Sequence, residues 1–404
     1  MERIILKADL ILHGRELAPM EKGAIVIENG RILDILPQHA LADFPIADAC
    51  ELSFPGQTLM PGMIECHNHL CIDATLPEHL ELLAWSNECQ LTILALKGLE
   101  EDLLSGVTTA RCMGDKYYID TTMKKLIEDG KATGPRLLAA GTGMKGSHGA
   151  GYIGSPHCGT EEIRNTCRQN LKRGVDLLKL FVTPGVPDPA SSFVPSFLSL
   201  EEISMAVSEG ARLGVPVAAH CIGGQGLKDC IDGGVKVIEH MYMATEQDVE
   251  WLAASDCVVD LTSGIFLDSS REAFLSPGNA EKIRRNRPRV RENAARIIRA
   301  GLPFVLGTDA YHGYLYREVG YAVELGADTV TALQGVTSHA ADVCGLGHRL
   351  GHLSSGMDAD IIAVNGNPLE NVSCLSQVGF VMKEGVVFKQ MCCLLYTSDA
   401  ADEL

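Results

Sequence analysis

One stretch of the chain reads Pro61-Gly62-Met63-Ile64-Glu65-Cys66-His67-Asn68-His69: a Pro-Gly break, an apolar segment and two histidines separated by one residue. In an extended strand, side chains two residues apart point to the same side. His67 and His69 would therefore present two imidazoles to one point at the end of a buried strand. Neutral imidazole is the commonest metal-binding side chain. An isolated pair can equally be two ordinary surface or core histidines, so the rest of the chain must supply partners.

The composition describes a large globular chain. With 404 residues, 46% of them apolar, it can hold one barrel-type domain plus an accessory, or two to three ordinary domains. The formal charge of −18 disfavours nucleic acid and anionic membranes as partners. We find no apolar run long enough to span a membrane and no signal-peptide pattern. Fourteen scattered cysteines without CxxC spacing indicate reduced thiols, so we expect a cytoplasmic protein.

Both ends of the chain have β character. Residues 4–59 alternate short apolar runs with turns, and Asn29-Gly30 between two such runs predicts a hairpin. After a helical stretch at 329–343, apolar runs return at 358–364 and 378–382. The simplest arrangement joins the two ends in one small β-sandwich.

These patterns predict the domain boundaries. We assign residues 1–59 and 353–390 to the β-sandwich and residues 60–352 to the barrel described next. Residues 391–404 break with what precedes them and look like translated sequencing-adapter read-through. They are predicted to be a dispensable, non-native tail.

Between the two β segments, apolar strands alternate with helix-like segments. Counting the His67 strand, this pattern predicts eight β/α units, which fit an α/β fold of the (β/α)8 TIM-barrel type. No Gly-x-Gly-x-x-Gly follows the first strand, so a dinucleotide-binding fold has little support. The other predicted strands are 106–112, 136–140, 175–182, 215–220, 235–240, 257–261 and 303–308. The predicted helices include 88–104, 161–173, 200–213, 246–254 and 281–300.

Polar residues lie at or near the ends of these apolar strands. In a TIM barrel the chemistry takes place at the carboxyl ends of the strands. Each residue has an ordinary structural explanation by itself, such as a satisfied core histidine or a helix cap. Together, in this order, they predict a metal site. In chain order they are His67, His69, Lys179, His220, His240 and Asp309.

From residue 1 to about 390, the chain resembles the amidohydrolase superfamily. The His-x-His, Lys, His, His and Asp series of that superfamily falls on the six positions above. A further match to its C-terminal signature is Gly356-Met357-Asp358-Ala359-Asp360-Ile361, followed by Gly366-Asn367-Pro368. Within the superfamily, the sequence is most similar to the imidazolonepropionase-like group that contains Xaa-Pro and Xaa-Arg dipeptidases.

The resemblance implies a site for two Zn²⁺ ions, or another divalent metal, bridged by a lysine that carbon dioxide has converted to a carbamate. The implied ligands are His67, His69 and Asp309 for one ion, His220 and His240 for the other, and Lys179 as the bridge.

The chemistry of these residue types agrees with the resemblance. A free lysine is cationic and binds no metal, but burial in an apolar strand lowers the pKa of Lys179 and leaves an amine that can add carbon dioxide. A hydroxide between two metals is a nucleophile at neutral pH. Asp309 would take its proton as general base and pass it to the leaving amine as general acid.

One position separates two activities within the superfamily. The deaminases and imidazolonepropionase itself carry a glutamate three residues after the histidine of strand five. Here that position is Gly223, three residues after His220. Without the glutamate, ring deamination lacks its proton shuttle, which favours amide hydrolysis.

Several loop residues are candidate substrate contacts. The segment from Gly141 to Gly149 resembles the Gly-Gly-His-Gly loop of the dipeptidase-like group, so His148 is a candidate contact for the substrate or its carbonyl; a surface histidine is the alternative. Lys145 lies in the same loop without a counterpart that we can place. Further candidates are His312 beside Asp309, Gln225 and Lys228 after strand five (a solvated helix face is the alternative for Lys228), and Tyr152, with Trp85, Tyr117 and Tyr118, above the barrel mouth.

We therefore predict a metal-dependent hydrolase that cleaves the amide C–N bond of a small acyl- or aminoacyl-amino acid, with a free carboxylate on the substrate. The alternative within enzymes is hydrolysis of a cyclic amide or imidazolone ring, or deamination. The alternative of another class is a non-catalytic structural or assembly protein on the same scaffold, which loss of metal ligands would mark. A homo-oligomer is expected by analogy only.

Overall fold

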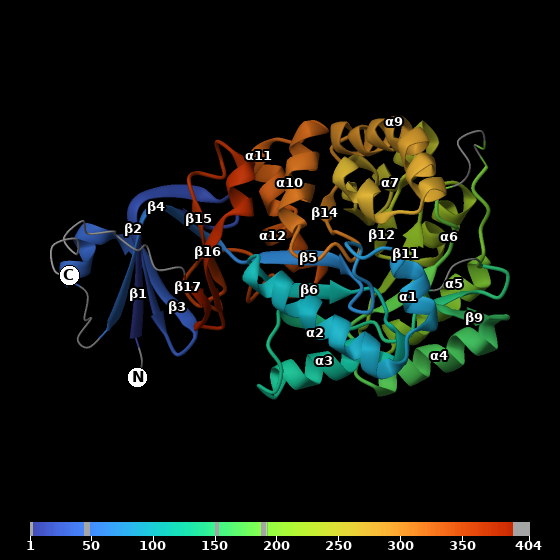
Figure 1. Cartoon of the computed structure of the whole chain (residues 1–404), viewed down its shortest axis with the longest axis horizontal. Helices are drawn as coiled ribbons and strands as arrows, with labels where there is room; N and C mark the ends of the chain where they lie inside the picture. The colour runs from blue at the N-terminus through green and yellow to red at the C-terminus, as the bar shows by residue number, and fades with distance from the viewer. Residues whose placement is uncertain (1–2, 44–48, 150–152, 187–190, 192, 391–404) are drawn as a thin grey trace, which may run out of the picture.

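The computed structural model describes residues 3–43, 49–149, 153–186, 191 and 193–390 (Figure 1). Two bodies lie side by side: a barrel of parallel strands wrapped by helices, and a mainly antiparallel sheet at one end of the molecule (Figure 1). The chain starts in the sheet, forms the barrel, and returns to the sheet. The predicted tail, 391–404, and Tyr152 lie outside the described residues.

All eight predicted barrel strands are present. Most begin one to three residues later than predicted. Two short strands that the sequence did not predict, β8 (Met144–Gly146) and β9 (Ser155–His157), extend the sheet beside the fourth barrel strand. The barrel strands are β5 (Met63–Asn68), β6 (Val107–Cys112), β7 (Arg136–Leu138), β10 (Leu178–Phe181), β11 (Val217–Cys221), β12 (Val237–His240), β13 (Val258–Leu261) and β14 (Phe304–Leu306).

The strands form two parallel ladders that meet at two seams. One ladder has the order β14-β13-β12-β11-β10-β8-β9 and the other β5-β6-β7. At the first seam, the Asp309 amide just after β14 donates to the His67 carbonyl of β5, 2.9 Å away. At the second, the Asp176 amide before β10 donates to Ala139 O after β7 at 2.8 Å. These contacts complete the ring and confirm the TIM-type barrel.

Helices surround the barrel. Local signals set several of their starts: the side chains of Asn87, Ser199 and Thr245 cap α2, α5 and α7 in capping boxes. The α-helices are α1 (His79–Trp85), α2 (Glu88–Leu104), α3 (Ile119–Glu128), α4 (Thr160–Lys172), α5 (Leu200–Ala211), α6 (Gln225–Gly233), α7 (Glu246–Ala253), α8 (Gly264–Leu267), α9 (Pro277–Arg299), α10 (Leu315–Glu324), α11 (Thr329–Gln334) and α12 (Ser338–Val343). Short 3-10 helices span Gln38–Asp43, Lys116–Tyr118, Ser269–Phe274 and Val372–Ser376.

The predicted helical stretch 329–343 is two helices, α11 and α12. Between them, Gly335 O accepts from Leu306 N at 3.1 Å, and Val336 O accepts from Ile64 N at 2.8 Å. A continuous helix would use both carbonyls internally. The break therefore ties this segment to β14 and β5 at the first seam.

The accessory body is one seven-stranded sheet built from both ends of the chain, in the order β17-β16-β15-β4-β1-β2-β3. Side chains from its two halves share one apolar cluster, in which Phe54 and Phe380 meet edge to face at 4.8 Å between ring centroids. The sheet thus folds over on itself, as a sandwich does. Its strands are β1 (Arg3–His13), β2 (Ala18–Glu28), β3 (Arg31–Pro37), β4 (Cys50–Pro61), β15 (Ile361–Asn365), β16 (Val378–Lys383) and β17 (Val386–Gln390).

Two further sequence predictions can be compared with the described residues. The cysteines among them are all free thiols. None of the described helices combines the length and apolar character that crossing a bilayer requires.

The two halves of the accessory sheet meet at Gly30, which is the basis of a stability test. Gly30 has φ +78°, and a Cβ there would lie 2.6 Å from Glu384 O, whereas Gly56 has φ +70° and nothing within 4 Å. We expect Gly56→Ala to lower the free energy of unfolding by about 1 kcal/mol through backbone strain alone. Gly30→Ala should cost about 2 kcal/mol more, because a backbone atom cannot yield as a side chain can. Urea unfolding of both variants measures this, and equal losses would contradict the close contact of the hairpins.

Candidate active site

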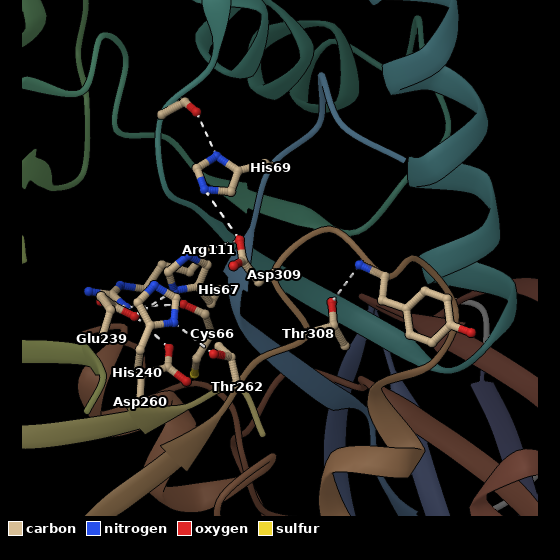
Figure 2. Close-up of polar contacts among 12 residues, drawn as sticks. Cys66, His67, His69, Arg111, Glu239, His240, Asp260, Thr262, Thr308 and Asp309 are labelled. Atoms are coloured by element: carbon tan, nitrogen blue, oxygen red, sulfur yellow. Dashed lines mark hydrogen bonds and ion pairs between the residues drawn. The ribbon is translucent and has the colours of Figure 1, made fainter. Parts of the chain in front are cut away.

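The predicted metal ligands come together at the carboxyl ends of the strands. A cavity of about 170 Å³ opens there, and four histidines and one aspartate line it. Figure 2 shows His67 and His69 from the end of β5, His240 from the end of β12 and Asp309 from the loop after β14. The lining ligands are His67, His69, His220, His240 and Asp309.

The donor atoms are close enough to share metal ions. Asp309 Oδ1 lies 3.4 Å from His67 Nε2 and 3.6 Å from His69 Nε2. The three groups offer ligand atoms that all lie within 4.8 Å of one another. The ring centroid of His240 is 4.7 Å from that of His67 and 4.5 Å from that of His220. His67 and His240 thus connect the two predicted sets of ligands.

A hydrogen bond at Nδ1 orients the ring of each of the first two histidines, His67 and His69. His67 Nδ1 donates to Glu239 Oε2 at 2.7 Å, and His69 Nδ1 donates to Gly114 O at 2.8 Å. With the proton on Nδ1, the Nε2 lone pair of each ring is available to a metal. Both side chains are almost fully buried, so their orientation is fixed by these contacts.

The other two histidines are oriented differently from each other. His240 Nδ1 lies 2.7 Å from Thr262 Oγ1, which leaves Nε2 for the site. His220 Nε2 lies 3.2 Å from Pro184 O, which leaves Nδ1 instead. Burial lowers the pKa of His220 to about 4 and that of His240 well below its ordinary value, with nearby cations adding to the effect. Both imidazoles are therefore neutral at pH 7, the form that binds metals.

A buried ion pair that sequence reasoning missed supports His67. Arg111 Nη1 lies 3.2 Å from Glu239 Oε1 and donates to Cys66 O at 3.1 Å (Figure 2). Burial raises the pKa of Glu239, but Arg111 and Lys179 outweigh it and hold the carboxyl ionised. An ionised Glu239 keeps the proton on His67 Nδ1. The available signals were an arginine inside the apolar strand 106–112 and a glutamate directly before His240.

Glu65, also missed, lies behind the ligands. Its Oε1 accepts from His67 N at 2.9 Å and from Thr308 N at 3.0 Å, so one side chain joins the ends of β5 and β14. Burial raises the pKa of Glu65 to about 8. A protonated carboxyl avoids a further negative charge behind the site.

Lys179 is fully buried on β10. Its Nζ has no hydrogen-bond partner among the described residues and lies 5.2 Å from the Phe181 ring centroid. Burial lowers the pKa of Lys179 to about 8, against the influence of Glu239 and Asp309. A buried amine without a hydrogen-bond acceptor is costly in a purely structural role. The position of Lys179 suits a side chain whose polar contacts are completed only when a ligand binds.

Two of the predicted metal ligands have left-handed backbone, as does the residue that follows each of them. His240 and Met241 have φ values of 82° and 53°, and Asp309 and Ala310 have 56° and 69°. Non-glycine residues rarely adopt left-handed backbone, and functional sites are where such strain is found. Burial raises the pKa of Asp309, but the neighbouring His67 and His69, together with Arg271 and Lys179, outweigh it, so the net pKa lies below its ordinary value. Asp309 is thus an ionised carboxylate.

Two of the predicted substrate contacts lie near the cavity without lining it. His148 is exposed and packs edge to face on Phe197, 5.4 Å between centroids. His312 is buried, with Nδ1 2.9 Å from Asp102 Oδ2 and Nε2 2.9 Å from Ile72 O. Both His312 nitrogens are engaged in these contacts, so its role here is to tie α2 to the loop after Asp309.

The other two described candidates lie on α6. Gln225 Nε2 donates to Asp229 at 2.8 Å, and Lys228 forms an ion pair with Asp232 one turn further along the helix. These are contacts within a solvated helix face. Neither side chain lines the cavity.

The cavity wall comes mainly from residues that the sequence did not single out. A second cavity of about 240 Å³ shares His69 and Ile153 with the first and reaches Tyr117. Phe181, two residues after Lys179, and Phe197 supply aromatic surface. The other lining residues of the first cavity are Leu80, Lys145, Ile153, Thr183, Pro184 and Gly185.

The comparisons with known proteins agree with this fold. The chain belongs to the Amidohydrolase family, whose profile matches residues 58–391. It is 28% identical to ochratoxinase from Aspergillus niger over 424 residues, covering 95% of this chain and 86% of the relative. It is 26% identical to imidazolonepropionase from Paracoccus denitrificans (strain Pd 1222), covering 87% of this chain and 92% of the relative.

A solved structure described as a Xaa-Pro dipeptidase with methionine bound in the active site superimposes with a TM-score of 0.84. It is 26% identical, and the match covers 96% of this chain and all of the other. Family, relatives and fold together identify a hydrolytic enzyme that acts on amide bonds, as the sequence predicted.

The His312–Asp102 pair predicts a pH-dependent stability. Burial alone lowers the pKa of His312, but Asp102 outweighs it and raises the pKa to about 9, from an ordinary value of 6.5. A raised folded-state pKa stabilises the fold below pH 6.5, and the stabilisation is lost as the pH rises to 9. Relative to His312→Gln, the wild type should lose about 3 kcal/mol of unfolding free energy across this window. Urea titrations at pH 6 and 9 measure the difference; parallel losses in both proteins would contradict a protonated His312.

Proposed function

We propose that this enzyme hydrolyses the amide bond between an acyl or aminoacyl group and a small amino acid, at a pair of zinc ions bridged by carboxylated Lys179. The observation that carries the proposal is the fully buried Lys179, whose Nζ has no hydrogen-bond acceptor among the described residues. The residues around it offer neutral imidazoles and a carboxylate, the donor set that zinc prefers.

Lys179 is suited to carboxylation. With a pKa of about 8, a substantial fraction of the amine is neutral near physiological pH. The neutral amine adds carbon dioxide and releases one proton, and the product is a carbamate with one negative charge. That charge offsets part of the positive charge of two divalent ions in a site with few other anions.

The ligand assignment follows the orientations of the rings. His67 and His69 with Asp309 would hold one ion, and His220 and His240 the other. When bound, such ions lower the pKa of water and polarise a carbonyl oxygen. The Glu239–His67 hydrogen bond and the Thr262–His240 contact fix the orientation of the two imidazole rings. Little reorganisation is therefore needed when metal ions bind.

Asp309 is the residue that we assign to proton transfer. It is ionised, it lies in the cavity, and 23% of its side chain is exposed, in contrast to the buried Glu65 and Glu239. As a base it accepts a proton from the attacking water, and as an acid it returns that proton to the leaving nitrogen. This sequence converts the leaving group from an amide anion to an amine.

Amide hydrolysis is favoured over ring hydrolysis or deamination by the position three residues after His220. Gly223 has φ +130°, and a Cβ there would lie 3.1 Å from Asp248 Oδ2. A glutamate is therefore disfavoured here by both backbone conformation and space. Ochratoxinase and the Xaa-Pro dipeptidase structure support a substrate with an amino acid on one side of the scissile bond.

Metal content tests the role of Lys179. Wild-type protein prepared with zinc and bicarbonate should contain close to two zinc ions per chain by elemental analysis. Lys179→Met should contain at most one, because it lacks the bridging carbamate. Lys172→Met, on the exposed end of α4, serves as the control. Two ions retained by Lys179→Met would refute the bridge.

Turnover tests the role of Asp309. Against a library of dipeptides and N-acyl-amino acids, we expect Asp309→Asn to keep most of its metal and to lose at least about 100-fold in kcat, since proton transfer typically contributes that much. Chelation should abolish activity in the wild type, and zinc should restore it. An Asp309→Asn variant with wild-type kcat would remove Asp309 from proton transfer; a wild type inactive on the whole library would refute the substrate class.

A further inference from the structure

Lys145 lines the active-site cavity. It lies on β8, whose ladder pairs Lys145 with Phe181 of β10, the strand that carries Lys179. Only 7% of its surface is exposed, and it lines the same cavity as Asp309. Burial lowers the pKa of Lys145. A desolvated cation in this position interacts more strongly with a bound anion than a solvated one does.

The other residues that line the cavity explain why the charge of Lys145 matters for binding. Apart from the histidines, Lys145 and Asp309 are the two charged side chains among the described residues that line the cavity. Phe181, Phe197 and Ile153 supply apolar surface. Apart from the histidines, Lys145 is the one cationic side chain among the described residues of this wall, so an anionic group would bind toward it.

The two charges also orient a substrate. Lys145 attracts a carboxylate, whereas the amide must lie at Asp309 for the proposed proton transfer. An acyl-amino acid would therefore bind with its carboxylate toward Lys145 and its amide toward Asp309, which is the orientation that the reaction needs.

Two other lysines near the cavity contact elements away from its wall. Lys116, in the adjoining cavity, donates to Leu83 O at 2.5 Å and to Ala84 O at 3.2 Å, which ties it to the end of α1. Lys228 pairs with Asp232 on α6. Neither reaches the wall of the first cavity.

We infer that Lys145 is a specificity-determining residue, which selects substrates with a free carboxylate on the leaving amino acid by binding that carboxylate directly. This inference rests on the proposed function and goes beyond it, because it assigns the recognition of the substrate to a residue outside the metal site.

The test compares two substrates in two proteins. The substrates are an N-acyl-amino acid that the wild type cleaves and the primary carboxamide of the same compound, which differ by one charge. In Lys145→Met, which keeps the length of the side chain, we expect kcat/KM for the acid to fall by roughly 10- to 100-fold, the range for a lost charged hydrogen bond. The loss should lie mainly in KM. The carboxamide should change by less than about 3-fold, and Lys145→Arg should recover part of the activity on the acid.

The control is Lys172→Met, which should change neither substrate. Equal losses of Lys145→Met on acid and carboxamide would show that Lys145 only shapes the cavity, and unchanged kinetics on the acid would likewise overturn the inference.

A failure of the proposed function is distinguishable from a failure of this inference. If the wild type cleaves no member of the library, the proposed function fails, and calorimetric binding of the acid and the carboxamide to zinc-loaded protein tests Lys145 separately. Tighter binding of the acid than of the carboxamide in the wild type, lost in Lys145→Met, supports the inference; no such preference in the wild type overturns it.

Discussion

Desolvation at the carboxyl ends of eight parallel strands is the constraint on which this site depends. Closing the strands into a ring brings their polar ends into one small space without bulk water. Burial there makes His220 and His240 neutral, lowers the pKa of Lys179 to about 8 and raises that of Glu65 to about 8. The barrel thus produces metal-binding protonation states at neutral pH from ordinary side chains.

The charges that remain in the barrel are held in place by contacts behind the ligands. Arg111 keeps Glu239 ionised, and Glu239 fixes the ring of His67. Arg111 also lies 3.8 Å from Asp260, whose pKa burial and the neighbouring Glu239 raise well above its ordinary value. One cation therefore compensates one carboxylate, and the other carboxyl is neutral. This arrangement avoids an unpaired buried charge, the costliest outcome for a barrel interior.

The substrate side of the site is built on different elements from the metal side. The ligands follow barrel strands, whereas Lys145, Ile153 and Phe197 lie on β8 and the loops around it. Loops at the carboxyl face of a barrel can change without disturbing the strands. The residues at the strand ends and the residues on these loops can therefore change independently of each other.

The sequence by itself determined the barrel, the union of the two ends and the series of polar residues at the strand ends. Each of these rests on a local signal: alternating strands and helices, the Asn29-Gly30 hairpin (φ 52° and 78°), and polar residues at the ends of apolar runs. Only the tertiary structure decided which loop residues face the cavity. His312, Gln225 and Lys228 are polar and close in sequence to ligands, yet each contacts another element or its own helix, whereas Lys145 lines the site. The direction of a loop side chain depends on packing between segments far apart in the chain, and no local pattern encodes that.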